Sequence, residues 1–309
     1  MKKLLIITLS FLLFSCKEPI ELFDTLKDSD KTIAKVLSYE LVENKYLKIR
    51  FDSPVELVEF QVDKTDYERF GIGNELFLSL PYPLSYGEEA VVSLTVKKES
   101  GNKTRASFIL QGFNERLPGM VINELSTDGS SSSPDRVELY MLTEGNTAGA
   151  LLTDTLDECV FSLPPIEVFQ GDIIVVYWDK PKREDDYTRQ SGKTIFLEAN
   201  ANKTINSKNG VFILKESRHG DIVDALIYSD SECEKFSAKA KADAEYLIAN
   251  GYWSGDAIDS TYVTSSRVIA RRPGAVDTDS ADDFFITAPR RSSFGEENIY
   301  APYIPNEFQ

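Results

Sequence analysis

The chain has 309 residues, with 50 Asp and Glu against 34 Lys and Arg, and its formal net charge at pH 7 is −16. An acidic surface repels a phosphate backbone, and nucleic-acid binding usually requires a basic patch, so the composition excludes nucleic acid as an expected partner. Hydrophobic residues make up 42% of the chain, which suits a globular protein, and the length suits two domains.

Residues 1–15 have the layout of a secretory signal peptide. Lys2 and Lys3 supply a positive start, Leu4 to Phe14 form an apolar run, and the small residue Ser15 precedes Cys16. The apolar run is about eleven residues long, whereas a membrane-spanning helix needs about twenty. The sequence therefore predicts export of the chain and no permanent transmembrane helix.

The quartet Leu13-Phe14-Ser15-Cys16 resembles a bacterial lipobox. The resemblance implies cleavage before Cys16 and a lipid on its thiol, because several acyl chains on one residue hold a protein to a membrane durably. It places the protein in the bacterial cell envelope, with the outer membrane or cell surface favoured over the inner membrane. Phe14 departs from the family's pattern, and the alternative is an ordinary signal peptide followed by an unrelated cysteine.

Two further cysteines, Cys159 and Cys233, lie beyond the signal peptide. An exported location permits a disulfide between them, and two separate thiols are the alternative. No feature of the sequence brings the two residues within bonding distance, so both alternatives stay open. The polar residues 16–32 are expected to form the lipidated cysteine and its tether.

Residues 33–113 predict a small all-β domain. Apolar and polar residues alternate at 47–51, 92–96 and 108–110, which is the pattern of half-buried strands. Strands at this spacing are typical of an immunoglobulin-like β-sandwich. Residues 114–119, which end in Pro118-Gly119, are the expected linker to the next domain.

Residues 120–300 carry an ordered series of strand motifs. The series consists of Val121-Ile122-Asn123-Glu124-Leu125, Arg136-Val137-Glu138-Leu139-Tyr140, apolar strands at 171–176, 209–214 and 221–228, and an ending that contains Asp277-Thr278, Asp283-Phe284 and Gly295-Glu296-Glu297-Asn298. In this order the motifs resemble the lamin-tail domain of bacterial exported proteins, which implies a second immunoglobulin-like sandwich. The expected fold is thus all-β, with two immunoglobulin-like β-sandwich domains in tandem and a C-terminal tail at 301–309.

A helical insertion at 231–250 departs from the lamin-tail pattern. Ser231 to Glu234 fit a capping box, and Gly251 supplies a stop signal. Apolar residues recur between them at helical spacing, namely Phe236, Ala240, Ala244 and Leu247. The apolar stripe predicts a helix that packs on the sandwich, and a partner-binding lid is the alternative.

The sequence predicts no catalytic residue and no cofactor. The single histidine, His219, lies in a turn-like segment, and no G-x-S-x-G elbow accompanies it. One histidine and two distant cysteines do not make a zinc site. Glu124 and Glu138 have the chemistry of an acid–base pair, but the lamin-tail resemblance implies a structural role for both.

The candidate calcium ligands are Asp277, Asp279, Asp282 and Asp283, because Ca²⁺ favours several carboxylates on one flexible loop. Their spacing lacks the glycine that an EF-hand loop requires. The lamin-tail resemblance implies instead that Asp277 and Asp282 accept hydrogen bonds from turn amides. We expect no metal site, with calcium binding as the alternative.

Together these features predict a membrane-anchored, non-enzymatic lipoprotein that presents its second domain to a protein or glycan partner, with the lipid on Cys16 as its contact with the membrane. The candidate contact segments are the loops 127–135 and 179–193 and the helix 231–250, because loops on rigid sandwiches commonly carry recognition. Two alternatives remain. One is an accessory subunit of a separate exported hydrolase (nuclease or phosphatase), and the other is a calcium-dependent adhesin.

Overall fold

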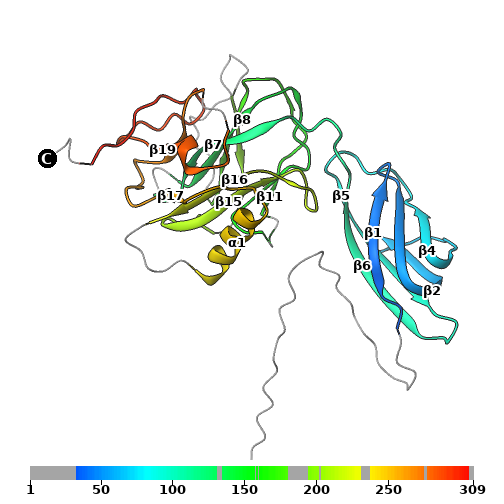
Figure 1. The fold of residues 1–309 in the computed structure, drawn as a ribbon. Helices are drawn as coiled ribbons and strands as arrows, with labels where there is room; N and C mark the ends of the chain where they lie inside the picture. The colour runs from blue at the N-terminus through cyan, green and yellow to red at the C-terminus, as the bar shows by residue number, and fades with distance from the viewer. Residues whose placement is uncertain are drawn as a thin grey trace, which may run out of the picture.

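The computed structural model describes residues 33–130, 134–156, 158, 160–179, 194–201, 203–230, 237–274 and 277–305. Within these ranges the protein is predominantly β, with one α-helix, and Figure 1 shows two lobes joined by a single passage of the chain. No helix in the described ranges is long and apolar enough to cross a membrane. The predicted signal peptide and all three cysteines (Cys16, Cys159 and Cys233) lie outside the described residues.

The first lobe is one curled sheet organised by a long strand, β2. Its strands are β1 (Val36–Val42), β2 (Tyr46–Val62), β3 (Thr65–Asp66), β4 (Ile72–Ser79), β5 (Glu89–Lys97) and β6 (Lys103–Gln111). The N-terminal half of β2 pairs with β1 and its C-terminal half with β5, and register shifts bend the sheet between these halves. The alternation predicted at 47–51 is confirmed, since Leu47, Ile49 and Phe51 are buried.

Curling brings the two ends of this sheet together. The strands β1 and β6 lie against each other, and the Thr104 hydroxyl donates a hydrogen bond to the Ala34 carbonyl oxygen at 3.2 Å. The enclosed side chains form a hydrophobic core that extends from Ala34 to Leu110. One wrapped sheet therefore encloses an apolar core, as two facing sheets do in a sandwich.

The second lobe contains two sheets that share one core. The larger sheet has the order β14-β13-β8-β7-β18-β19 and the smaller β11-β10-β15-β16-β17, with a short pair β9-β12 beside them. The bounds are β7 (Met120–Ser126), β8 (Arg136–Met141), β9 (Gly145–Asn146), β10 (Leu151–Thr153), β11 (Phe161–Ser162), β12 (Glu167–Val168), β13 (Ile173–Tyr177), β14 (Thr194–Glu198), β15 (Asn209–Lys215), β16 (Ile222–Ser229), β17 (Ile258–Asp259), β18 (Ile269–Arg271), the 3₁₀ turn η1 (Ala281–Asp283) and β19 (Phe284–Ile286). Trp178, at the end of β13, meets Phe212 of β15 edge-on at 5.0 Å, which joins the two layers.

The helix α1 (Ala238–Ala249) lies against β15 on the outside of the smaller sheet. It begins later than predicted: Ser237 is its N-cap and accepts a hydrogen bond from the Ala240 amide at 3.1 Å, whereas the expected cap at Ser231 lies outside the described residues. Ala244 and Leu247 are buried, so the predicted packing stripe is confirmed there. Gly251, at a φ of +79°, ends the helix as expected.

Candidate functional site

Two carboxyl groups with the chemistry of an acid–base pair lie side by side in the larger sheet. Glu124 of β7 and Glu138 of β8 are register partners, and both side chains are buried. The Ser293 amide donates to both carboxylate oxygens of Glu124 at 3.0 Å. The Gly295 amide donates to Glu138, and the Asn123 side chain donates to its other oxygen at 2.7 Å. The C-terminal segment thus supplies donors to both strands.

Asn298 completes this arrangement. Its side-chain nitrogen donates to the backbone oxygen of Arg271 at 2.7 Å and to that of Asn123 at 3.2 Å. Its side-chain oxygen accepts a hydrogen bond from the Ser293 hydroxyl at 3.1 Å. We call Glu124, Glu138, Ser293, Gly295 and Asn298 the C-terminal lock. The strand motifs and the G-x-x-N ending of the sequence are therefore the two halves of one hydrogen-bonded network.

The lock perturbs the acidity of its two carboxyl groups. Burial raises the pKa of Glu124 to about 7. Burial also raises the pKa of Glu138, to about 8, and the neighbouring charge of Glu124 adds to the effect. Raised values of this kind are common in catalytic acids. Here both groups are covered by the segment that they bind, so their oxygen atoms are occupied by backbone and side-chain donors.

A second buried network surrounds Arg271 at the end of β18. One guanidinium nitrogen lies 2.9 Å from Asp224 and another 2.9 Å from Asp277, while Asp283 lies at 3.8 Å. The remaining nitrogen, Nε, donates to the Ile122 carbonyl oxygen at 3.0 Å. Burial raises the pKa of Asp224 to about 7 even though the Arg271 charge opposes that shift. We call Arg271, Asp224, Asp277 and Asp283 the arginine cluster.

The structure brings three of the four candidate calcium ligands, Asp277, Asp279 and Asp283, to the surroundings of Arg271 and Asp224. Asp277 and Asp279 lie with Asp224, each offering an oxygen within 4.8 Å of the others. Arg271 already supplies positive charge to this group, as a cation would. The turn-capping role expected of Asp277 is confirmed, since Asp277 accepts a hydrogen bond from the Asp279 amide at 3.3 Å. The same role expected of Asp282 was wrong: Asp282 is exposed, and Asp283 accepts from the Thr278 and Ser280 amides instead.

Hydrogen bonding also decides the acidity of Asp283. Burial acts to raise its pKa, but hydrogen bonds from Thr278 and Ser280, with the Arg271 charge, hold the pKa below its ordinary value. Its carboxylate therefore stays charged beside the guanidinium. Sequence reasoning missed Arg271 as a site residue, although an arginine directly after the apolar run Val268-Ile269-Ala270 is a signal for a buried ion pair.

The two lobes meet through a specific set of contacts. The Arg218 guanidinium binds both carboxylate oxygens of Glu89, at 2.9 and 3.1 Å, and the Arg218 amide donates to Gln111 at 2.8 Å. We call Arg218, Glu89 and Gln111 the interdomain clasp. Gly87 and Gly149 approach so closely that a Cβ on Gly87 would lie 2.4 Å from the Gly149 nitrogen. The junction is therefore built for close backbone contact.

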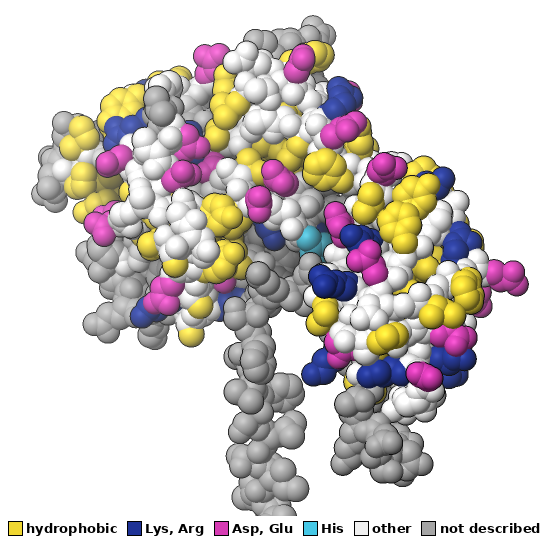
Figure 2. Space-filling model, turned by 45° about the vertical axis from the view of Figure 1, so that its right-hand side comes forward, with side chains coloured by type: hydrophobic (Ala, Val, Ile, Leu, Met, Phe, Trp, Pro, Cys, Tyr) yellow, Lys and Arg dark blue, Asp and Glu magenta, His cyan; other side chains and the backbone are white. Residues whose placement is uncertain are grey.

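His219 lies at this junction between the lobes. Figure 2 shows it, in cyan, between the two lobes, and its ring meets that of Tyr39 edge-on at 6.4 Å. Tyr39 belongs to the first lobe and His219 to the β15–β16 hairpin of the second. The single histidine thus takes part in contact between lobes.

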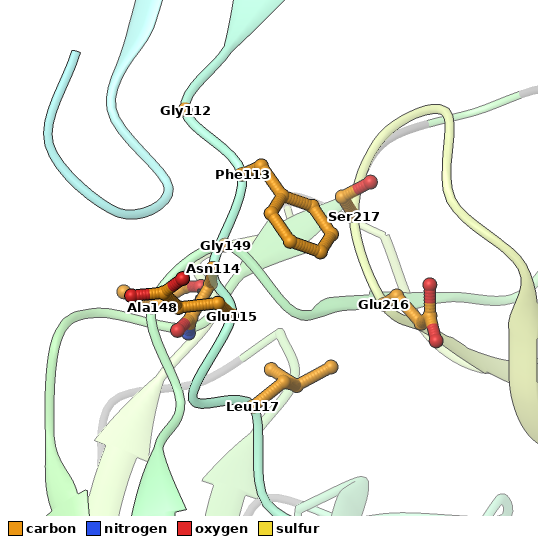
Figure 3. Close-up of a pocket in the computed structure, with 9 residues that line it drawn as sticks. All are labelled: Gly112, Phe113, Asn114, Glu115, Leu117, Ala148, Gly149, Glu216 and Ser217. Atoms are coloured by element: carbon orange, nitrogen blue, oxygen red, sulfur yellow. Dashed lines mark hydrogen bonds between the residues drawn. The ribbon is translucent and has the colours of Figure 1, made fainter. Parts of the chain in front are cut away.

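A cavity of about 220 Å³ opens beside the clasp, and we call it the junction pocket. Its walls come from the passage between the lobes (Gly112 to Leu117), from Ala148 and Gly149, and from Glu216 and Ser217 of the β15–β16 hairpin. Figure 3 shows Phe113 and Leu117 projecting toward Glu216 and Ser217, while Asn114 and Glu115 extend on the other side of the chain. No sequence motif indicated this pocket, because three distant segments build it.

A smaller cavity of about 170 Å³ lies between α1 and the smaller sheet. Four of its charged side chains form ion pairs: Lys203 lies 2.7 Å from both Asp154 and Glu158, and Lys239 lies 3.5 Å from Glu158. These ion pairs connect the helix to the sheet. The predicted contact helix is thereby tied to the domain through its charged face as well as its apolar stripe.

The structure describes most of the candidate contact loop 127–135 and only residue 179 of the loop 179–193. Asp135 closes the 127–135 loop, since its two oxygens accept hydrogen bonds from the Gly129 amide at 2.7 Å and the Ile205 amide at 2.9 Å. Burial raises the pKa of Asp135 to about 6. Residues 131–133 of this loop and residues 180–193 of the other lie outside the described ranges.

Comparison with known proteins gives one family. A family model described as a protein second domain, that of TP_1001, matches residues 118–286, which is more than half of the chain. A crystal structure of a DUF4876 family protein from Bacteroides thetaiotaomicron is similar at 11% identity with a TM-score of 0.37, covering 84% of this chain and 96% of that one. A search of curated proteins found no match.

Proposed function

The chain belongs to the TP_1001 second-domain family through residues 118–286, and we propose that it is a lipid-anchored, non-enzymatic binding protein of the bacterial cell envelope. Cys16 carries the anchor in this proposal, and the two lobes together present a surface to a protein or glycan partner. We propose further that both lobes are of the immunoglobulin-like type and that the second is a lamin-tail-like domain. The shared core of its two sheets and the order of its motifs support this assignment.

One observation carries the proposal: the groups best suited to acid–base chemistry are used to hold the fold. Both oxygens of Glu124 accept from Ser293, and the oxygens of Glu138 accept from Gly295 and Asn123. A general acid or base must reach a proton on its substrate within hydrogen-bond distance. These carboxyl groups reach the C-terminal segment instead, which supports a binding role over catalysis.

The anchor is tested by labelling cells with a fatty acid and fractionating their membranes. We expect the wild-type chain to be labelled and membrane-bound, and the Cys16→Ser variant to be unlabelled and to move to the soluble fraction. Cys159→Ser is the matched control and should keep both the label and the membrane fraction. Persistence of Cys16→Ser in the membrane would refute the anchor.

The binding role is tested by affinity capture from envelope extract with the full chain. Specific recovery of a protein or glycan without enzymatic activity supports the leading proposal. Recovery of a hydrolase alone would favour the accessory-subunit alternative.

A further inference from the structure

We propose that the junction pocket binds the side chain of a lysine or arginine on a partner protein. The inference deepens the proposed binding role, on which it rests, by naming the chemistry of the partner. It starts from the shape of the pocket. Drug-sized ligands occupy cavities of roughly 300–1,000 Å³, whereas the junction pocket holds about 220 Å³. A single long side chain is a better match to this size than a cofactor.

Phe113 is the apolar wall of the pocket, and its backbone is held in place. The Phe113 amide donates to the side-chain oxygen of Asn44 at 2.6 Å, and the Asn44 side-chain nitrogen donates to the Phe113 carbonyl oxygen at 2.9 Å. Despite this support, 63% of Phe113 is exposed. Leu117 continues the apolar surface on the same side of the chain (Figure 3). The fold therefore presents an aromatic ring that no packing in the described residues explains.

Glu216 supplies negative charge across the pocket from this ring. It is exposed, and no ion pair among the described residues includes its carboxylate. The two arginines nearest in sequence to the pocket walls are already paired, Arg116 with Glu167 at 2.7 Å and Arg218 with Glu89 at 2.9 Å. Among the described residues, the pocket thus keeps a carboxylate with no ion-pair partner.

An aromatic face, an aliphatic contact and a carboxylate fit one ligand chemistry. The methylene stem of lysine or arginine packs on apolar surface while its charged end stays near water and a counter-charge. A cation close to an aromatic face gains a further attraction. The net charge of −16 attracts a basic partner to the whole protein and so favours encounter.

The walls are fixed before any ligand arrives. The Asn114 side chain donates to the carbonyl oxygens of Asn146 and Ala148, at 2.7 and 3.0 Å, and so joins the interlobe passage to the second lobe. The interdomain clasp holds the hairpin that carries Glu216. Such preorganisation lowers the entropic cost of binding.

The test is saturation-transfer NMR on the full chain, extracted in detergent. The probes are lysine and arginine capped as N-acetyl N-methylamides, the equally capped norleucine as a neutral analogue with the carbon skeleton of lysine, and free pentylamine. We expect saturation of the lysine and arginine methylenes to exceed that of norleucine by about threefold or more, the scale of one partly exposed ion pair with a cation–π contact. Added salt should reduce the difference by screening.

Two variants locate the binding. Glu216→Gln and Phe113→Ala should each reduce the lysine signal by about threefold, and Glu99→Gln, which removes an exposed carboxylate in the β5–β6 turn, should leave it unchanged. An unchanged tryptophan emission spectrum checks that each variant is folded. Three results would overturn the inference. They are equal saturation of norleucine and lysine, unchanged saturation of lysine with Glu216→Gln, and stronger saturation of pentylamine than of capped lysine. If the full chain captures a partner but none of these probes binds, the proposed binding role is supported and the lysine or arginine site is refuted.

Discussion

Protonation of two buried residues couples the stability of the second lobe to pH. Burial raises the pKa of Glu124 and Glu138 to about 7 and about 8, from an ordinary value of 4.5. The folded chain therefore keeps protons that the unfolded chain has already released. It follows that the contribution of these two groups to the free energy of unfolding is fully present below about pH 4.5 and is lost as the pH rises through 7 to 8.

Glu124→Gln should weaken this pH dependence. The neutral amide can accept from the Ser293 amide and donate to the Ser293 hydroxyl, so the lock keeps its shape. We expect the fall in unfolding free energy between pH 5 and pH 9 to shrink by roughly 3 kcal/mol, because the pKa of Glu124 rises from 4.5 to about 7 on folding. Urea unfolding followed by tryptophan fluorescence measures it, because both tryptophans, Trp178 and Trp253, are buried in the second lobe. The exposed Glu99→Gln variant should behave like wild type.

Arg271 is the second residue on which the lobe depends. Arg271→Met would leave Asp224 buried without its counter-charge, and removing one partner of a buried ion pair costs about 3–5 kcal/mol. The same tryptophan-monitored unfolding should show this loss. Arg291→Met, which changes an exposed arginine of the C-terminal segment, should cost little. Equal stability of the two variants would contradict the role given to the arginine cluster.

At the scale of elements, Leu247 is the largest apolar side chain that α1 buries. Leu247 is fully buried, whereas the adjacent Ile248 is 48% exposed. We expect Leu247→Ala to lower the unfolding free energy by about 2–5 kcal/mol and Ile248→Ala to have a much smaller effect. If α1 were a lid that leaves the sheet freely, the two variants would differ little. Denaturant titration of the matched pair distinguishes these outcomes.

The strands were easier to predict than their connections. The motifs at 121–125 and 136–140 correspond to β7 and β8, because an apolar run between turns specifies a buried strand locally. The start of α1 was placed too early, since Ser231 and Ser237 are both acceptable caps and only the tertiary structure selects between them. The junction pocket was beyond prediction because Phe113, Gly149 and Glu216 meet only in the folded chain.

At the scale of the molecule, the interdomain clasp fixes how the lobes are placed. Arg218→Glu sets two negative charges against each other at Glu89, so we expect the lobes to separate and the radius of gyration in small-angle scattering to increase. The double variant Glu89→Arg with Arg218→Glu restores an opposite pair and should return the wild-type scattering curve. If Arg218→Glu gave the wild-type scattering curve, the clasp would not be needed to hold the two lobes in place.

The order of synthesis determines when the C-terminal lock can form. The hydrogen bonds from Ser293 to Glu124 join residues 169 positions apart, whereas the Thr104 contact that closes the first lobe spans 70. The ribosome therefore supplies both partners of the first-lobe contact early, whereas the donors Ser293 and Gly295 follow all the strands of the second lobe. A nascent chain that lacks residues 293–298 has two glutamates that cannot be buried at low cost. We expect the first lobe to become protease-resistant on ribosomes stalled before residues 293–298 have emerged, and the second lobe only once those residues are available.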